Sequence, residues 1–487
     1  MPGTSRLKLL MRIRARPPRV AAHLCVGIVL LSGVVVAQEN PVRLEGVIGT
    51  ELHWYPSRPL HPVSQSPQDD TANARIEVRA DPRIAVKFND LSASFGFMAR
   101  KDFALAARDE FRIDDLWVEW KRKSFRLRIG NQVNRWTVMD IRQPAEVLVR
   151  RDWDDLWDPE TLRQPMVRVV IAKPRWGLNL AWVPVFSPDR FRFGAPNRWD
   201  TTRPQPQLVD LGGAQPTGAI FEGLDEARIW VREDGSLVIR DRNRKGVLDG
   251  GYGARFTAHV GPADIGIHLY NGRDQLPTTM DVVVLSQQTN GNGDIVTANL
   301  EIVPVHARFT TGGASLAVTT GPVVWKAEGG AFLTADRQRT HCTIDDDYLL
   351  WAAGGEALLD NLIGTTDVQF RLEVSGDHQL PKAGDTVDNH TPDTEQSDCV
   401  FGIRDPRHVN RLVVAGNLVW KFGPVGLDLK AMVTYEGDWL AHLGAVVVPT
   451  EGLEIVVAGF LVGGGPEDWF GAYRKNDRLE LSTRFRF

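Results

Sequence analysis

The stretch DRLELSTRFRF occupies positions 477–487 of the sequence. Leucine, threonine and phenylalanine take one parity of this stretch, and arginine, glutamate and serine take the other. A period of two over this length indicates a β-strand with one apolar and one charged face. Phe485 and Phe487 end it, where soluble proteins more often have frayed polar residues. The pattern suits the last strand of a barrel with lipid outside and a polar lumen inside, and also the last strand of a soluble sandwich.

The opposite end of the sequence narrows this choice. Six basic residues and no acidic residue precede position 39, and residues 20–36 are almost wholly apolar. Small residues at positions 35–37 then predict a secretory signal peptide over residues 1–37, with an uncleaved anchor as the alternative. Beyond position 37 no apolar run reaches the about 18 residues of a spanning helix. We therefore expect an exported chain that is either soluble in the periplasm or a barrel.

Charge and composition exclude nucleic acid as a partner. The chain has 57 lysines and arginines against 61 aspartates and glutamates, and the leader removes six basic residues, so the mature chain has a net charge near −10. A nucleic-acid-binding domain would show the opposite excess. The 15 tryptophans, 45 glycines and only 3 cysteines fit a large exported β-protein with aromatic girdles and many turns.

Strand-like segments follow one another along the chain, and their connections are alternately short and long. Three short connections share a Gly-Pro turn, at Gly261-Pro262, Gly321-Pro322 and Gly423-Pro424. Glycine adopts the unusual φ of a tight reversal and proline presets the next φ, so these turns mark one repeated edge. The expected long connections are residues 187–224, 272–294, 335–347, 376–406 and 463–476.

Short turns at one edge and long loops at the other are typical of outer-membrane barrels. The fold class predicted is therefore all-β, a transmembrane up-and-down antiparallel β-barrel of about 18 strands, within a range of about 16–20. Residues 38–487 form a single barrel domain with long extracellular loops in this interpretation. The expected location is the outer membrane of a Gram-negative cell.

Residues 113–199 also resemble a known group of proteins. The segments are RIGNQ at 128–132, PAEVL at 144–148 and WVPVFSPDR at 182–190. They resemble an uncharacterised porin-like family that is related in architecture to alginate-export channels. The chain departs from that pattern at Asn131, where a basic residue is expected, and at Val149, where an asparagine is common. The resemblance implies transport, with an envelope exporter as a partner, and leaves the solute open.

The lumen-facing parity selects candidate residues for the pore. One strand places four polar side chains on this parity, and the loop that follows adds several charges. Lumen charge tunes the selectivity of such channels, although the same residues could pair across the interior and only solvate the wall. The candidates for pore lining or constriction are Arg126, Arg128, Gln132, Asn134, Arg135, Arg142, Arg150, Arg151 and Asp152.

The loop over residues 135–165 has two interpretations. It mixes arginines with acidic residues and two tryptophans. It either folds inward and narrows the pore with opposed charges, or forms a short amphipathic helix that covers the extracellular mouth.

No recognisable catalytic motif, cofactor motif or metal site occurs in the sequence. The start of a calcium loop at 241–246 has Lys245 at a ligand position and no closing glutamate. We therefore expect a channel for small solutes, with no enzyme activity, no cofactor and no metal. The alternatives are a surface structural or adhesion barrel whose lumen is closed by loops, and a soluble periplasmic glycan-binding all-β protein.

Two further expectations concern assembly. Phe485 and Phe487 would be the signal recognised by the barrel-assembly machinery, and a homo-oligomer in outer-membrane lipid is one expected state. Cys342 and Cys399 remain in the mature chain, and an oxidising compartment favours a disulfide between them over two free thiols.

Overall fold

The computed structural model describes most of the chain after the expected leader. The described residues are 42–56, 74–103, 109–153, 159–190, 226–229, 250–275, 279–289, 295–335, 347–360, 366–380, 411–465, 470 and 477–487. The expected signal peptide, Cys342, Cys399 and the calcium-like segment lie outside these residues. Within them, no helix is long and apolar enough to cross a membrane.

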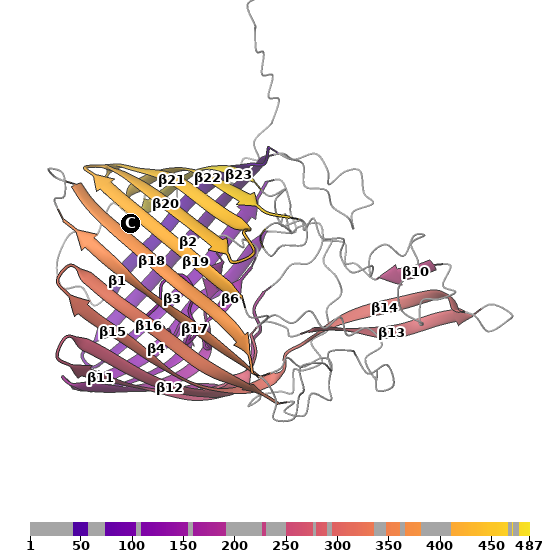
Figure 1. The fold of residues 1–487 in the computed structure, drawn as a ribbon, viewed down its shortest axis with the longest axis horizontal. Coiled ribbons are helices and arrows are strands. Elements are labelled where there is room, and N and C mark those ends of the chain that lie inside the picture. The colour runs from indigo at the N-terminus through magenta and orange to yellow at the C-terminus, as the bar shows by residue number, and fades with distance from the viewer. Residues whose placement is uncertain are drawn as a thin grey trace, which may run out of the picture.

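Eighteen strands form one antiparallel sheet (Figure 1). They are β1 (Val42–Trp54), β2 (Ala74–Phe88), β3 (Leu91–Asp102), β4 (Glu110–Arg122), β5 (Phe125–Gln132), β8 (Gln164–Ala172), β9 (Trp176–Val183), β11 (Gly251–Val260), β12 (Ala263–Arg273), β15 (Arg308–Thr320), β16 (Val323–Thr334), β17 (Tyr348–Leu359), β18 (Thr366–Gln379), β19 (Leu412–Phe422), β20 (Val425–Thr434), β21 (Trp439–Thr450), β22 (Leu453–Gly463) and β23 (Arg478–Arg486).

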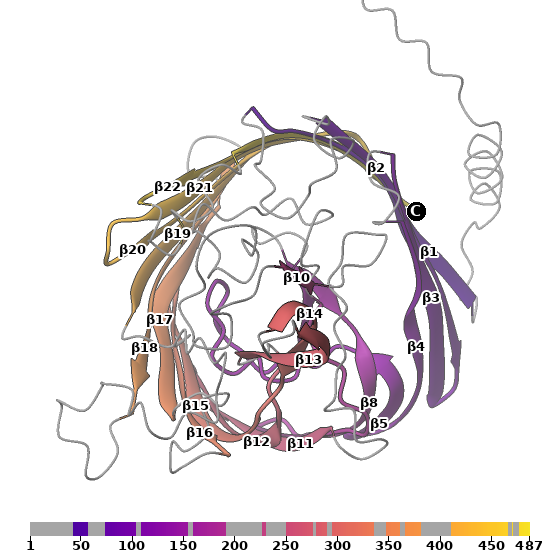
Figure 2. The same cartoon turned by 90° about the vertical axis from the view of Figure 1, so that its right-hand side faces the viewer.

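The sheet closes on itself because β23 pairs with β1, with Arg486 opposite Val47 and Leu479 opposite Trp54. Each of the other strands pairs with its neighbours along this series, so the sheet has no free edge (Figure 2). This confirms the predicted up-and-down barrel and its expected number of strands.

Five described strands lie outside this sheet. β6 (Arg150–Asp152) and β7 (Glu160–Leu162) pair with each other, and β10 (Glu226–Ile229), β14 (Ile295–Val305) and β13 (Thr279–Thr289) form a three-stranded sheet. The hairpin of β13 and β14 occupies much of the connection between β12 and β15, part of which we expected to be a loop over residues 272–294. The β-branched apolar run in VVVLSQ and the apolar residues of NLEIVPV are strand signals that the long-loop interpretation missed.

The long connections lie at one end of the barrel, as the sequence indicated, and that end also has the short connection 435–438 between β20 and β21. Gly261, Gly321 and Gly423, which begin the three Gly-Pro turns, have φ angles of 60°, 60° and 58°. A side chain is strained at such angles, which explains why glycine occupies each turn. β1 begins and β23 ends at this short-turn end, because Val47 lies opposite Arg486.

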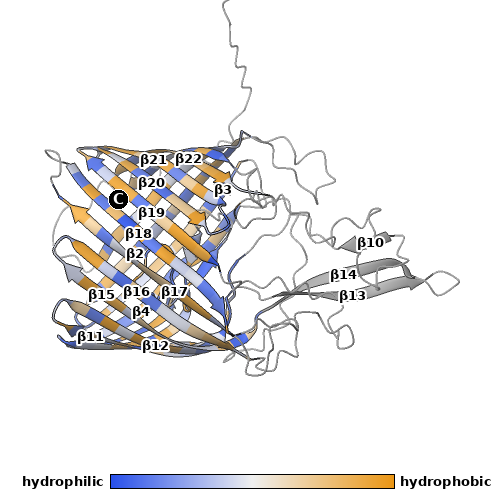
Figure 3. Ribbon diagram, viewed as in Figure 1, coloured by the Kyte–Doolittle hydropathy of each residue, from blue (hydrophilic) through white to orange (hydrophobic). Residues whose placement is uncertain are grey.

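The two faces of the barrel have opposite polarity. Large apolar side chains such as Ile129, Ile267 and Leu443 are more than half exposed on the outer face, and charged side chains such as Glu119 are buried on the inner face. Figure 3 shows the resulting alternation of orange and blue along the strands. An outer surface of this kind needs lipid around it, since a soluble protein rarely exposes such large apolar patches.

The terminal strand has the parity predicted from positions 477–487. Phe485 faces outward and is 41% exposed. Arg484 bonds to Glu51 at 3.3 Å and Arg486 bonds to Glu454 at 3.1 Å, both across neighbouring strands. Two backbone hydrogen bonds join Phe487 to β1, from the Gly46 amide at 3.0 Å and to the Gly46 carbonyl at 3.1 Å.

Gly46 leaves room for the ring of Phe487. A Cβ atom at Gly46 would lie 2.7 Å from Cζ of Phe487, which is too close for two carbon atoms. The end of the last strand therefore depends on a glycine in the first.

We expect deletion of Phe487 to lower the yield of folded barrel markedly, because it removes both backbone hydrogen bonds to Gly46 and the terminal ring. Phe487→Ala should have a milder effect, since it keeps the backbone bonds. Arg486→Ala should be nearly silent, because its ion pair with Glu454 is exposed and such pairs contribute little. The measurement is the heat-modifiable fraction on cold electrophoresis of outer membranes. Equal losses for Arg486→Ala and Phe487 deletion would contradict the assigned role of Phe487.

Candidate functional site

The chain that follows β5 turns into the interior of the barrel. Figure 2 shows this purple segment inside the ring of strands. Gly130 has a φ of 129°, and a Cβ there would lie 2.1 Å from the carbonyl oxygen of Leu116 on β4. The glycine of RIGNQ thus permits the close approach at which β5 ends. We refer to residues 133–149 as the inward loop.

Glu328 on β16 holds the inward loop from the wall. Its carboxylate accepts hydrogen bonds from the Val138 amide at 2.8 Å, the Ala145 amide at 2.7 Å and the Thr137 hydroxyl at 3.0 Å. The side chain is only 4% exposed. Three donors on one buried carboxylate provide the pairing that a charge away from bulk water requires.

Glu373 on β18 holds the next part of the same loop. It accepts hydrogen bonds from the backbone amides of Asp140 at 2.8 Å, Ile141 at 3.1 Å and Arg142 at 3.3 Å. The guanidinium of Arg142 also bonds to Asp377 on the same strand at 2.8 Å. The inward loop therefore crosses from β5 to the wall at β16–β18.

Apolar packing supports the same loop. Trp136 and Leu148 are each 1% exposed and pack with Met166 on β8 and Tyr270 on β12 in a small core inside the barrel. A Cβ at Gly253 on β11 would lie 2.6 Å from Trp136, so a glycine in the wall admits the indole ring.

The chain after the inward loop contacts a different part of the wall. Glu160 on β7 accepts from Arg79 on β2 at 2.9 Å and also bonds to Arg112 on β4. Arg163 forms an ion pair with Asp114 on β4. Residues 133–153 and 159–163 are thus bound to two sectors of the barrel, β16–β18 and β2–β4.

Arg190 and Asp189 tie the next long connection to this arrangement. Arg190 bonds to Glu110 on β4 at 2.6 Å and to Asp152 on β6 at 2.9 Å. Burial opposes the charge of Arg190, but these carboxylates outweigh it and raise its pKa above the usual value. Burial raises the pKa of Asp189 to about 6, although the indole N–H of Trp153 donates to it at 2.7 Å.

Four sequence candidates belong to β5 and its continuation. Arg126 and Arg128 face the lumen and share Glu119 on β4, at 3.6 Å and 2.7 Å. Gln132 and Asn134 are 2% and 1% exposed, so they do not face open space as we had expected. Gln132 donates to a backbone carbonyl of β8 at 2.9 Å and fixes the base of the inward loop.

The remaining candidates lie in the loop. Arg135 is the most exposed of them and donates to Thr161 at 2.9 Å. Arg150 donates to the carbonyl of Pro188 at 2.7 Å, and burial lowers its pKa to about 10. Arg151 donates to a side chain of the inward loop, and Asp152 is 1% exposed against Arg190. The structure brings these residues together, and their hydrogen bonds and ion pairs support the loop.

Sequence reasoning missed the two carboxylates that hold the loop. Neither Glu328 nor Glu373 was among the candidates. Alternation along β16 and β18 places both on the inner face, so the available signal was an acidic residue on a lumen parity. That signal does not reveal which lumen carboxylate meets the backbone of a distant loop.

The described loop residues 135–153 and 159–165 contain no helix. Of the two sequence interpretations, the inward-folded loop therefore agrees with the structure.

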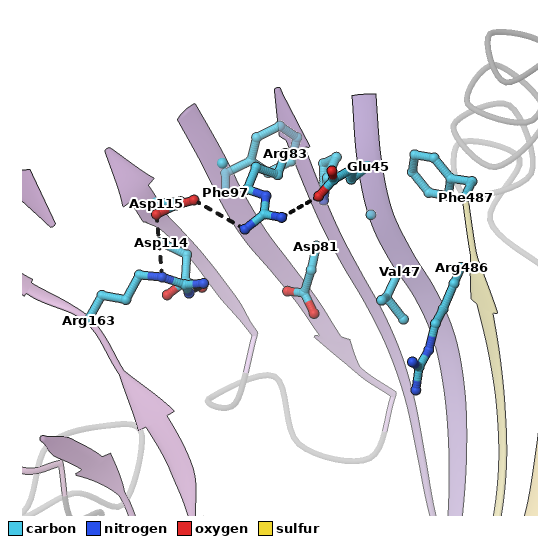
Figure 4. Close-up of a pocket in the computed structure, with 13 residues that line it drawn as sticks. Glu45, Val47, Asp81, Arg83, Phe97, Asp114, Asp115, Arg163, Arg486 and Phe487 are labelled. Atoms are coloured by element: carbon cyan, nitrogen blue, oxygen red, sulfur yellow. Dashed lines mark hydrogen bonds and ion pairs between the residues drawn. The ribbon is translucent and has the colours of Figure 1, made fainter. Parts of the chain in front are cut away.

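An open recess of about 500 Å³ lies against the wall at β1–β4, and Arg163, between β7 and β8, also lines it. Arg83 lies at its centre, with ion pairs to Glu45 and, at 3.7 Å, to Asp115 (Figure 4). Arg163 from the loop side reaches Asp115 at 3.5 Å. Pro82, which has no backbone N–H, interrupts the ladder between β2 and β3 at this level.

The chain is similar in structure to solved outer-membrane proteins at low sequence identity. No protein-family model matches the chain, and no curated protein matches it. A solved variant of the Rhodopseudomonas blastica porin is similar over 92% of this chain and 100% of that chain, with 10% identity and a TM-score of 0.38. Pseudomonas aeruginosa OpdK, solved with vanillate, is similar over 92% of this chain and 98% of that chain, with 12% identity and a TM-score of 0.47.

We expect Glu373→Gln to release one part of the inward loop selectively. The substitution removes the charge that holds three amides, and a hydrogen bond to a charged group contributes about 1.5–3 kcal/mol. Hydrogen exchange measured by mass spectrometry should accelerate at residues 140–142 and remain slow at Val138 and Ala145. Glu328→Gln should give the reverse pattern. Glu454→Gln, a lumen carboxylate paired with Arg486, is the control that leaves both regions unchanged. Uniform acceleration in both variants would show that the two carboxylates do not act locally.

Proposed function

We propose that this chain is a porin-like channel of the outer membrane that passes small solutes through its lumen beside the inward loop. The observation that carries this proposal is a closed barrel with a charged inner face, in which one loop is bound to the wall at β16 and β18 and an open recess remains at the wall of β1–β4. A barrel interior of this kind can hold water, and its charges act on a passing solute.

The loop acts in this proposal as the constriction of the channel. Its bonds to Glu328 and Glu373 keep it across the lumen, so its position does not depend on the solute. Arg135 and Arg126, whose side chains are 56% and 37% exposed, are the candidates that we expect a solute to reach, together with Arg128 beside Arg126. Asp152 and Arg150 support the loop.

The soluble glycan-binding alternative has no support in the outer surface. Side chains such as Leu269 and Val457, which are 60% and 55% exposed, would face water in that case. Insertion by the barrel-assembly machinery with Phe485 and Phe487 as the signal belongs to the same proposal, as do a homo-oligomer and an envelope exporter as partners.

Purified refolded protein in a planar lipid bilayer tests the channel. We expect discrete conductance steps in potassium chloride from the wild-type barrel. Folded barrel that inserts and gives no conductance at any voltage would support the alternative of a structural or adhesion barrel with a closed lumen.

The double variant Glu328→Gln/Glu373→Gln should have a larger unitary conductance or more frequent fluctuations than the wild type. Its inward loop loses both carboxylates that hold it, so the constriction widens or moves. The single variant Glu454→Gln is the matched control and should conduct like the wild type. A double variant indistinguishable from this control would show that residues 133–149 do not limit the current.

A further inference from the structure

An excess of positive charge lies on the inner face of β5 and β8. Arg126 and Arg128 project from β5, and Arg168 projects from the neighbouring β8. Arg128 and Arg168 are directly opposite each other in the strand register. Like charges in this position destabilise a pair of strands, so their juxtaposition requires compensation.

The carboxylates of the protein neutralise only part of this positive charge. Glu119 is the carboxylate within ion-pair distance of Arg126 and Arg128, and it serves both. Arg168 forms no ion pair with any described residue, and its side chain contacts Asn179 at 3.4 Å. These three arginines therefore have one carboxylate between them.

Arginines elsewhere on the inner face are matched differently. Arg371 pairs with Glu356 at 3.1 Å, and Arg484 pairs with Glu51 at 3.3 Å. The excess does not follow from the net charge of the chain, which is negative. It extends from β5 and β8 to Arg255 on β11, which lies opposite Asn179, bonds to Ser315 at 3.2 Å and forms no ion pair with a described residue.

The nearest turns also carry positive charge. The turn between β4 and β5 and the turn between β8 and β9 are exposed and carry basic side chains at the short-turn end of the barrel. A low-dielectric cleft lined by one sign of charge focuses the field and concentrates counter-ions. The basic residues of these two turns and of the adjoining end of β4 are Lys121, Arg122, Lys123, Lys173 and Arg175.

The arrangement is also held in place. The guanidinium of Arg128 lies 4.0 Å from the ring centroid of Trp117, a cation–π contact that orients it. Asn179, which accepts from Arg168, donates to Asn134 at 2.9 Å, at the base of the inward loop. The arginines therefore stand next to the constriction, on its short-turn side.

We propose that Arg126, Arg128 and Arg168 form a binding station for an anionic solute that carries carboxylates. This inference rests on the proposed channel function and specifies the class of solute. Guanidinium groups bind carboxylates through two parallel hydrogen bonds, and the station offers three such groups for one resident carboxylate. A dicarboxylate or tricarboxylate would supply the missing negative charge between Arg128 and Arg168.

The test uses citrate as the probe and two independent measurements on the whole refolded protein. Calorimetric titration of the detergent-solubilised barrel measures binding without any need for conduction. Reversal potentials in a potassium chloride gradient, and block of the current by citrate, measure the same station in a bilayer. Binding should weaken as ionic strength rises, because salt screens exposed charges.

Arg168→Gln should weaken citrate binding about tenfold or more, as expected when one charge-assisted contact is lost, and should shift the reversal potential toward cation preference. Arg484→Gln removes one lumen charge of similar exposure to Arg126 but from a matched ion pair, so its citrate affinity should stay within about twofold of the wild type. Heat-modifiability confirms that each variant is folded.

The outcomes separate the two proposals. A conducting wild type that does not bind citrate, or equal affinities of Arg168→Gln and Arg484→Gln, would overturn the station and leave the channel intact. Citrate binding that depends on Arg168 in a barrel that does not conduct would support the station and overturn the channel. Weaker citrate binding together with lost anion preference in Arg168→Gln supports both.

Discussion

The pairing of β23 with β1 is the contact on which the rest of the structure depends. A strand in hydrocarbon has no water for its N–H and C=O groups, so a sheet there must close completely. The hydrogen bonds between Phe487 and Gly46 complete that closure at the end of the last strand. Once the sheet is closed, its two faces are exposed to different environments. Alternating residues of each strand then face the lipid and the lumen in turn.

Closure also creates the conditions for the inward loop. The lumen face collects carboxylates and arginines because the outer face excludes them, and these groups are partly withdrawn from water. Such charges need partners, and the backbone amides of residues 138–145 supply partners for Glu328 and Glu373. The loop is therefore held by the same polarity that makes the interior compatible with water. The arginines of β5 and β8 have one carboxylate between them, and we assign the missing partner to the solute.

The alternation at positions 477–487, the Gly-Pro turns and the sequence of short and long connections were enough to predict a barrel of this size. Each is a local property of the chain, because period two and turn chemistry act between near neighbours. The same reasoning treated residues 272–294 as a loop and missed the hairpin of β13 and β14. It also predicted that Gln132 and Asn134 line the pore. In the structure the loop buries both side chains, so they do not face open space.

The class of fold, the strand parity and the charged character of the interior follow from patterns within single segments, so they could be predicted from the sequence. Which charges meet depends on how the strands are arranged in space. Glu328 lies 190 positions from Val138, and only barrel closure brings the two together. The opposition of Arg128 and Arg168 likewise depends on the register between β5 and β8. Contacts between distant segments are set by strand order and register, which no local pattern encodes.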